Sequence, residues 1–219
     1  MVHLQNSNLP SSMPKNSLTL AKHEVILFHQ KRELTELMGI ETRNKYEILD
    51  ANKSIIGFAA EQQKGLFGFL ARQFFGHWRK FDIYFYNNDR NIVIHAHHPF
   101  RFLFQRLEIF DGNGKPLGAI QQRFSILTKK FDVINHLGLS VLEISSPIWK
   151  PWTFPFLQNG RQVAMVKKKM SGIFNEIFTD KDNFILEYTD ANLREDLRCL
   201  VLAGCLFIDL QYFERKANR

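Results

Sequence analysis

The hydrophobic pattern of the chain is dominated by one apolar stretch in its last quarter. Residues 193–213 read LREDLRCLVLAGCLFIDLQYF, and ten apolar residues follow one another from Cys199 to Ile208. An amphipathic surface helix has a single apolar face, whereas here apolar side chains cover every side. A membrane-spanning helix needs about 20 predominantly apolar residues, and this run is about half as long. We predict a central helix over 193–213 that is surrounded by protein; the alternative is a C-terminal membrane anchor.

The residue types within this helix favour close packing. A glycine in mid-helix costs about 1 kcal/mol relative to alanine, so Gly204 suits the close packing of another backbone, in a buried helix or in a membrane anchor. Cys199 and Cys205 point about 120° apart on one helix and cannot pair with each other, so we interpret them as core residues. The residues that we expect to form the barrel-core helix are Cys199, Leu200, Leu202, Ala203, Gly204, Leu206 and Phe207.

The N-terminal part has a different pattern. Residues 1–19 are rich in Ser, Asn and Pro, which is typical of a flexible tail. Residues 20–38 show helical periodicity. The apolar residues Val25, Phe28, Leu34 and Leu37 fall near one face, and charged residues occupy the other sides. We therefore predict a short amphipathic helix over 20–38 that packs on a larger body.

Beyond this helix, from about 44 to 190, the pattern changes to strands and tight turns. Turn-forming residues separate paired apolar runs at five places, namely 50–53, 87–90, 111–114, 136–139 and 159–160. Five hairpins give ten strands, NFILEYTD adds a last one, and connecting stretches can supply more. So many strands would leave a costly edge unless the sheet closed, and a closed barrel of that size has room for the apolar helix. We predict a mainly β fold with α structure: one domain over 20–219, a closed barrel of about twelve strands around the central helix.

Charge is distributed unevenly along the 219 residues, whose net charge is +7. Residues 62–175 hold 16 Lys and Arg against 6 Asp and Glu, a net charge of +10. A basic middle segment indicates an anionic partner, either phospholipid headgroups or nucleic acid, although a solvated surface has the same composition. The chain has no disulfide framework and no apolar signal region at its start, so we expect it in the cytoplasm, peripheral on the cytosolic face of the plasma or inner membrane.

Several motifs together carry a resemblance to a known family. In order along the chain they are GIETRNKYEILD, FDGNGKPLGAI, SGIFNEIFTDKDNFILEY and LVLAGCLFIDLQYFE, with 41–61 and 172–214 the strongest segments. This order resembles the phospholipid scramblases, which belong to the tubby-like superfamily. The resemblance implies a twelve-stranded barrel around a central C-terminal helix. It also implies bidirectional, calcium-stimulated movement of phospholipids across a membrane.

Aromatic and basic residues stand where animal scramblases carry acylated cysteine clusters. They lie in 65–81, 99–106 and 147–156, and such residues suit a bilayer interface, where rings sit at headgroup depth and cations meet anionic lipid. The alternative for each aromatic residue is ordinary packing in the barrel, and for Lys167, Lys168 and Lys169 a solvated strand end. The predicted lipid contacts are Phe67, Phe69, Phe74, Phe75, Trp78, Arg79, Lys80, Trp149, Lys150, Trp152, Phe154, Lys167, Lys168 and Lys169.

The calcium segment that the resemblance implies falls on 180–190. Candidate ligands there are Asp180, Asp182, Glu187 and Asp190. An EF-hand loop needs oxygen ligands at positions 5 and 12 and glycine at position 6, and this segment has none of them there. Two interpretations of this segment therefore remain: a calcium site of another geometry, and a simple turn that leads into a buried strand.

Other chemistry is weakly indicated. His95 and His97 share one face of a predicted strand, a spacing open to a metal ion, but no Cys, Asp or Glu is close in sequence, so a solvated strand end is the simpler interpretation. We find no motif of an enzyme active site and expect no catalytic residue. Two hypotheses remain: a scramblase-like lipid translocator, and a non-transporting tubby-like module that binds anionic lipid, phosphoinositide or, less well supported, nucleic acid.

Overall fold

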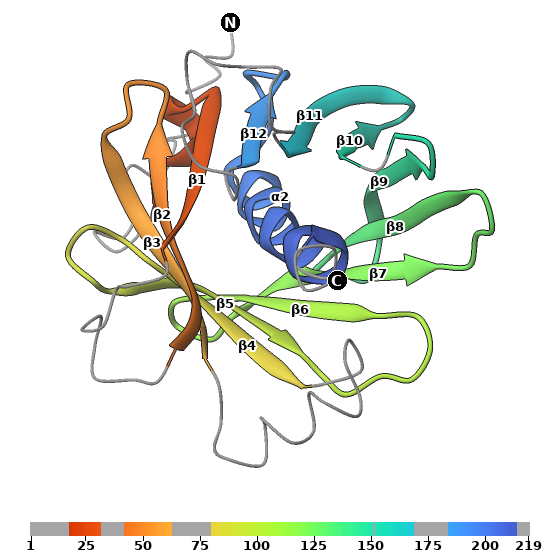
Figure 1. The fold of residues 1–219 in the computed structure, drawn as a ribbon, viewed down its shortest axis with the longest axis horizontal. Coiled ribbons are helices and arrows are strands. Elements are labelled where there is room, and N and C mark those ends of the chain that lie inside the picture. Colours follow the sequence, from red (N-terminus) through yellow and green to blue (C-terminus); the bar gives the residue numbers. More distant parts are fainter. Residues whose placement is uncertain (1–17, 32–41, 63–79, 151, 169–183, 214–219) are drawn as a thin grey trace, which may run out of the picture.

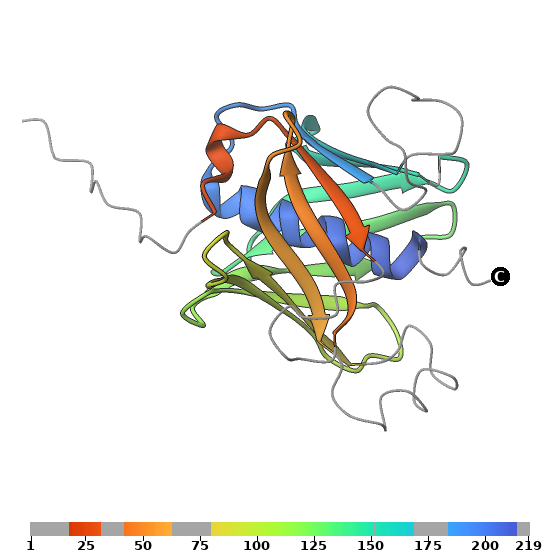
Figure 2. The same cartoon turned by 60° about the vertical axis from the view of Figure 1, so that its left-hand side comes forward.

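The computed structural model describes residues 18–31, 42–62, 80–150, 152–168 and 184–213. Within them, strands curve around one long helix, which is shown end-on in Figure 1 and from the side in Figure 2. The barrel and its central helix confirm the predicted fold class.

Twelve antiparallel strands form the closed barrel. Each strand pairs with the next one along the chain, and β1 closes the barrel by pairing with β12, from Val25 opposite Glu187 to Phe28 opposite Phe184. The strands are β1 (Val25–Lys31), β2 (Thr42–Asp50), β3 (Ile55–Gln62), β4 (Phe81–Tyr86), β5 (Ile92–His98), β6 (Arg106–Asp111), β7 (Pro116–Arg123), β8 (Thr128–Asn135), β9 (Ser140–Pro147), β10 (Thr153–Gln158), β11 (Arg161–Lys168) and β12 (Phe184–Tyr188).

The central helix α2 spans Glu195–Ile208 and continues as a π-helical turn, η3 (Asp209–Phe213). Its apolar residues are buried in the barrel, with Cys199 half-buried, which confirms the prediction of a helix enclosed by protein. A side chain at Gly204 would lie 2.9 Å from Ile120 Cδ1 and 3.1 Å from Phe156 Cζ, so glycine lets these two side chains reach the helix. In the part of the chain that the structure describes, no helix has the length and apolar character needed to cross a membrane.

The five predicted turns are all present, and in four of them a polar side chain accepts a hydrogen bond from the backbone of its own turn. Asp111 Oδ1 accepts hydrogen bonds from the backbone N–H groups of Asn113 at 2.9 Å and Lys115 at 2.8 Å. Asp50 and Asn135 make the same pair of bonds in their own turns. The fifth turn is formed by Asn159 and Gly160, which both adopt positive φ. Because each of these signals lies within its own turn, the five turns were readable from the local sequence.

The predicted helix over 20–38 is wrong in its described part. Residues Leu20–Lys22 form one short 3₁₀ turn, η1, and Val25–Lys31 form strand β1. Residues 32–38 and most of the predicted tail lie outside the described residues, but Leu18, which we placed in the tail, is buried in the core. This segment forms a strand because the barrel has to close. Strands β12 and β2 each need a hydrogen-bonded neighbour, and β1 pairs with both.

A buried arginine fixes the beginning of the helix. The Arg198 guanidinium has five N–H donors, and each meets a backbone carbonyl at 2.9 to 3.2 Å. Its acceptors are Leu20, His23, Asp190, Ala191 and Leu193. The same group lies 4.4 Å from the centre of the Tyr188 ring, a cation–π distance. One side chain thereby joins η1, the approach to β1, the end of β12 and the start of α2.

We expect Arg198→Lys to lower the free energy of unfolding by about 3 kcal/mol or more, because lysine has three donors and leaves buried carbonyls without partners. Urea denaturation followed by circular dichroism measures the change. Arg194→Lys is the matched control: Arg194 is exposed and pairs with Asp196 at the surface, so its replacement should change stability by less than about 0.5 kcal/mol. Equal stability of the two variants would contradict the role assigned to Arg198.

Candidate functional site

The connections between strands gather at two ends of the barrel. Because successive strands run in opposite directions, the five short turns lie at one end, which we name the short-turn end. The connections 99–105, 124–127 and 148–152 lie at the other end, toward which α2 runs (Figure 2). We name the described residues of these three connections the long-loop rim.

Exposed apolar side chains concentrate on the long-loop rim. Of the thirteen large apolar side chains that are exposed in the described part of the chain, nine belong to it. Such a group is more than single exposed residues would explain, and it marks a surface that meets something apolar. The nine residues are Phe100, Phe102, Leu103, Phe104, Phe124, Ile126, Leu127, Ile148 and Trp149.

The charged residues within the rim are all basic. Arg101 and Lys150 are exposed, and the three connections contain no Asp or Glu. Lys80, just before β4 at the same end, is also exposed. Apolar tips with cations beside them and no carboxylate are complementary to an anionic lipid surface, where rings enter the headgroup layer and cations remain at phosphate depth.

The structure separates the predicted lipid contacts of the segment 147–156. Trp149 is 68% exposed and Lys150 is exposed, as a surface contact requires. Trp152 is partly buried against the core. Phe154 is fully buried, so its prediction as a lipid contact is wrong: it lies on β10 and points into the barrel, 5.7 Å from the ring of Tyr212.

The lysines at the end of β11 also differ from each other. Lys167 Nζ donates to Glu187 Oε2 at 2.7 Å and remains partly exposed. Lys168 Nζ lies 3.3 Å from Asp209 Oδ1, and its side chain is only 12% exposed. The prediction that Lys168 contacts a membrane is therefore wrong, because its charge faces the buried Asp209 at the end of α2.

Other predicted site residues lie outside the described residues, so their predictions stay as they are. These residues are Phe67, Phe69, Phe74, Phe75, Trp78, Arg79 and Lys169 among the lipid contacts, and Asp180 and Asp182 among the calcium ligands.

The two described carboxylates of the calcium segment have partners of their own. Glu187 accepts from Lys167, and Asp190 Oδ1 accepts from the backbone N–H of Asn192 at 2.9 Å. Asp190 thus stabilises a turn after β12, whereas the turn that the simpler interpretation places at 180–183 lies outside the described residues.

Sequence reasoning missed one part of the rim. The connection 124–127 reads FSIL, lacks Gly, Pro and Asn, and was not recognised as a loop. A usable signal was present, because this apolar run stands between the basic residues Arg123 and Lys129. An apolar tip flanked by cations is typical of a membrane-facing loop.

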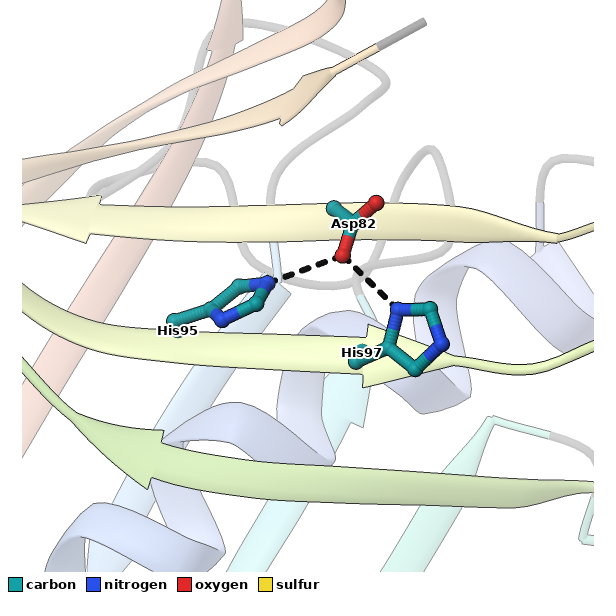
Figure 3. Close-up of side chains that lie close together, drawn as sticks. All are labelled: Asp82, His95 and His97. Atoms are coloured by element: carbon teal, nitrogen blue, oxygen red, sulfur yellow. Dashed lines mark hydrogen bonds and ion pairs between the residues drawn. The ribbon is translucent and has the colours of Figure 1, made fainter. Parts of the chain in front are cut away.

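The structure also brings an acidic residue to the two histidines. Asp82 on β4 lies opposite His97 on β5, and Figure 3 shows both histidine rings turned toward it. Asp82 Oδ1 is 2.8 Å from His95 Nε2 and 2.8 Å from His97 Nδ1. These atoms form the only group of three potential metal ligands that the described residues bring together. The two histidines are partly exposed, as a solvated strand end requires, but they share a buried carboxylate that the sequence analysis did not find.

The environment of Asp82 favours its charged form. Burial by itself would raise the pKa of this carboxyl, but the hydrogen bonds and positive charge of His95 and His97 outweigh it, and the pKa is lowered from its ordinary value. Asp82 is thus an ionised acceptor, which suits both an ion pair and metal ligation.

Comparison with known proteins points to one family. The family model for scramblases matches residues 4–215. Human phospholipid scramblase 2 is 29% identical over 221 residues, which cover 94% of this chain and 73% of the relative. Bos taurus phospholipid scramblase 2 is 30% identical over 220 residues, with the same coverage. The altered inheritance rate of mitochondria protein 25 of Saccharomyces cerevisiae is 22% identical over 245 residues, covering 94% and 75%. None of the solved structures matches the chain.

The distinction between rim and core aromatics predicts two different stabilities. Phe154→Ala should lower the free energy of unfolding by about 3 to 5 kcal/mol, because it removes a fully buried ring. Phe124→Ala should change it by less than about 0.5 kcal/mol, because this ring is 75% exposed. Urea denaturation of both variants measures the difference, and similar losses would contradict the division between rim and core.

Proposed function

The chain belongs to the scramblase family, and we propose that it moves phospholipids in both directions between the leaflets of a membrane, on which it docks through the long-loop rim. The observation that carries this proposal is the rim itself: nine exposed apolar side chains, basic neighbours and no carboxylate at one end of the barrel. The relatives named phospholipid scramblases support the choice of lipid as the partner.

The physical basis of docking is the transfer of rim side chains into the headgroup layer. Each square ångström of apolar surface removed from water contributes about 25 cal/mol, and aromatic side chains supply 150 to 250 Å² each. Arg101 and Lys150 add attraction to anionic lipid, worth about 1 kcal/mol for each residue near the surface. We place the contact on the cytosolic face, where such lipids are enriched.

The central helix has no part in this docking. It is enclosed by strands, and its two ends are held by Arg198 and by the buried Asp209, which accepts a hydrogen bond from Tyr46 at 2.8 Å. Drawing it into a membrane would break both sets of contacts and expose the barrel core. Rim insertion instead disturbs headgroup packing from outside and lowers the barrier to lipid crossing. This process is downhill and breaks no bond, so no enzyme chemistry is needed.

A second candidate is a tubby-like module that binds anionic lipid or phosphoinositide without transporting it. The filled barrel is compatible with both candidates, because α2 occupies the lumen with fully buried residues such as Val201, Leu202 and Ala203. A lipid cannot pass through that interior. Kinship of fold also does not guarantee a shared activity.

Docking is tested with variants at the two ends of the barrel. Phe124→Ser combined with Trp149→Ser should weaken binding to vesicles of phosphatidylcholine and phosphatidylserine by at least about tenfold, because two rings no longer enter the interface. Vesicle flotation measures the bound fraction. The matched control is Leu137→Ser combined with Leu139→Ser, an equally exposed pair at the short-turn end, which should bind as the wild type does. Equal weakening by both pairs would contradict docking through the rim.

Translocation is tested by dithionite quenching of fluorescent phospholipid in vesicles reconstituted with the full chain. We expect quenching well beyond half of the signal, because inner-leaflet lipid is moved into reach of the reagent. The assay is run with and without calcium, and a faster rate with calcium supports the stimulation that the family resemblance implies. Quenching that stops near half, with the protein still bound, would reject translocation and favour the lipid-binding module.

A further inference from the structure

We propose that Asp82, His95 and His97 bind a divalent transition-metal ion of the zinc class, with a coordination position left open toward solvent. This site is separate from the calcium segment that the family resemblance places at 180–190. Its three ligands lie on the adjacent strands β4 and β5, and metal binding to them can be measured without lipid.

The geometry brings the three ligands to one point. His95 and His97 are two residues apart on β5, so their side chains project from the same face of the sheet. Asp82 stands opposite His97 on the adjacent strand. The three ligand atoms lie within 4.8 Å of one another. Ligands on one zinc ion, each about 2.0 to 2.2 Å from it, are separated by about 3 to 3.5 Å. Small side-chain movements therefore suffice to admit the ion.

The ligands are held in place by their surroundings. The Asp82 side chain is only 6% exposed, so its carboxylate is fixed between the two imidazoles. The His95 ring stacks on Tyr84, with centroids 4.6 Å apart, and lies 5.8 Å from the ring of Phe110. A site whose side chains are already ordered loses little conformational entropy when the ion binds.

The donor set selects the class of ion. Two imidazole nitrogens and one carboxylate oxygen suit Zn²⁺, Co²⁺ and Ni²⁺, whereas Ca²⁺ takes six to eight oxygen ligands. Three protein ligands leave a fourth position for water or an anionic oxygen, as in open zinc sites. Both histidines remain partly exposed, so solvent reaches the two imidazole ligands.

The cysteines are poor competitors for such an ion. Thiolate is the form that binds metal, and burial raises the pKa of Cys199 to about 12 and that of Cys205 well above its ordinary value. Both therefore remain protonated near neutral pH. Heat released when zinc is added to the folded chain is therefore not expected to come from these two cysteines, and variants of the histidine and aspartate ligands can test its source.

The site lies at the base of the long-loop rim. His97 is the next-to-last residue of β5, and the connection 99–105 follows that strand. Asp82 is the second residue of β4 at the same end. A bound ion would link β4 to β5 where this connection begins, so metal binding should raise the thermal unfolding temperature.

Isothermal titration of the full, tag-free chain with zinc chloride near neutral pH tests the proposal without lipid. We expect one ion per chain with micromolar affinity, and Co²⁺ should give the visible absorption of a four-coordinate ion. Asp82→Asn, which keeps the shape of the side chain, and His97→Ala should each weaken zinc binding at least about tenfold. His136→Ala changes an exposed histidine at the short-turn end and should leave zinc binding unchanged.

Circular dichroism and thermal unfolding without metal confirm that each variant is folded, so that lost binding reports lost ligands. Failure of the wild type to bind zinc, cobalt or nickel would overturn the proposal, and so would wild-type affinity in both ligand variants. Calcium, titrated in parallel, should give the same heat in the wild type and in Asp82→Asn. Since no vesicle is present, the result does not depend on whether the chain scrambles lipid.

Discussion

The Arg198 guanidinium holds the helix in register with the barrel. The hydrophobic effect that buries this apolar helix is non-directional, so by itself it does not fix the position of the helix along the barrel axis. Five hydrogen bonds to fixed carbonyls supply the missing direction at one end. At the other end Asp209 accepts from Tyr46 and pairs with Lys168. The fold therefore depends on two buried charged side chains, one at each end of the apolar helix.

With the lumen filled, the chemistry of this protein lies on its outer face and at its ends. The short-turn end is stabilised by side chains such as Asp50 and Asp111, which bond their own backbone. The long-loop rim presents most of its large apolar side chains to solvent. Of the exposed large apolar side chains in the described residues, nine thus lie on the rim and four at the short-turn end. This difference between the two ends favours one orientation at an apolar surface, with the long-loop rim toward that surface.

The features that the sequence predicted well were local, and those it missed depend on distant residues. Each turn signal lay within a few residues, and the apolar helix was visible in one window. Strand β1 was mistaken for a helix because Ile26, Leu27 and Phe28 are all buried, which removes the alternation of a strand. Lys168 was mistaken for a surface residue because Asp209 is 41 positions away. The position of Asp82 beside the histidines could have been predicted from the sequence, since the predicted hairpin at 87–90 places Asp82 nearly opposite His97.

The closing of the barrel by β1 and β12 has a consequence for how the protein is made. All twelve strands leave the ribosome before the helix that fills them, so the nascent sheet has no core on which to fold. In addition, β1 can pair with β12 only after β12 has been synthesised. The Leu20 N–H can likewise bond to Glu195 only after that residue, 175 positions further on, has been synthesised. Such long-range closure is slow and leaves apolar strand faces exposed meanwhile. Newly made chains are therefore expected to need chaperone protection until synthesis has passed the helix.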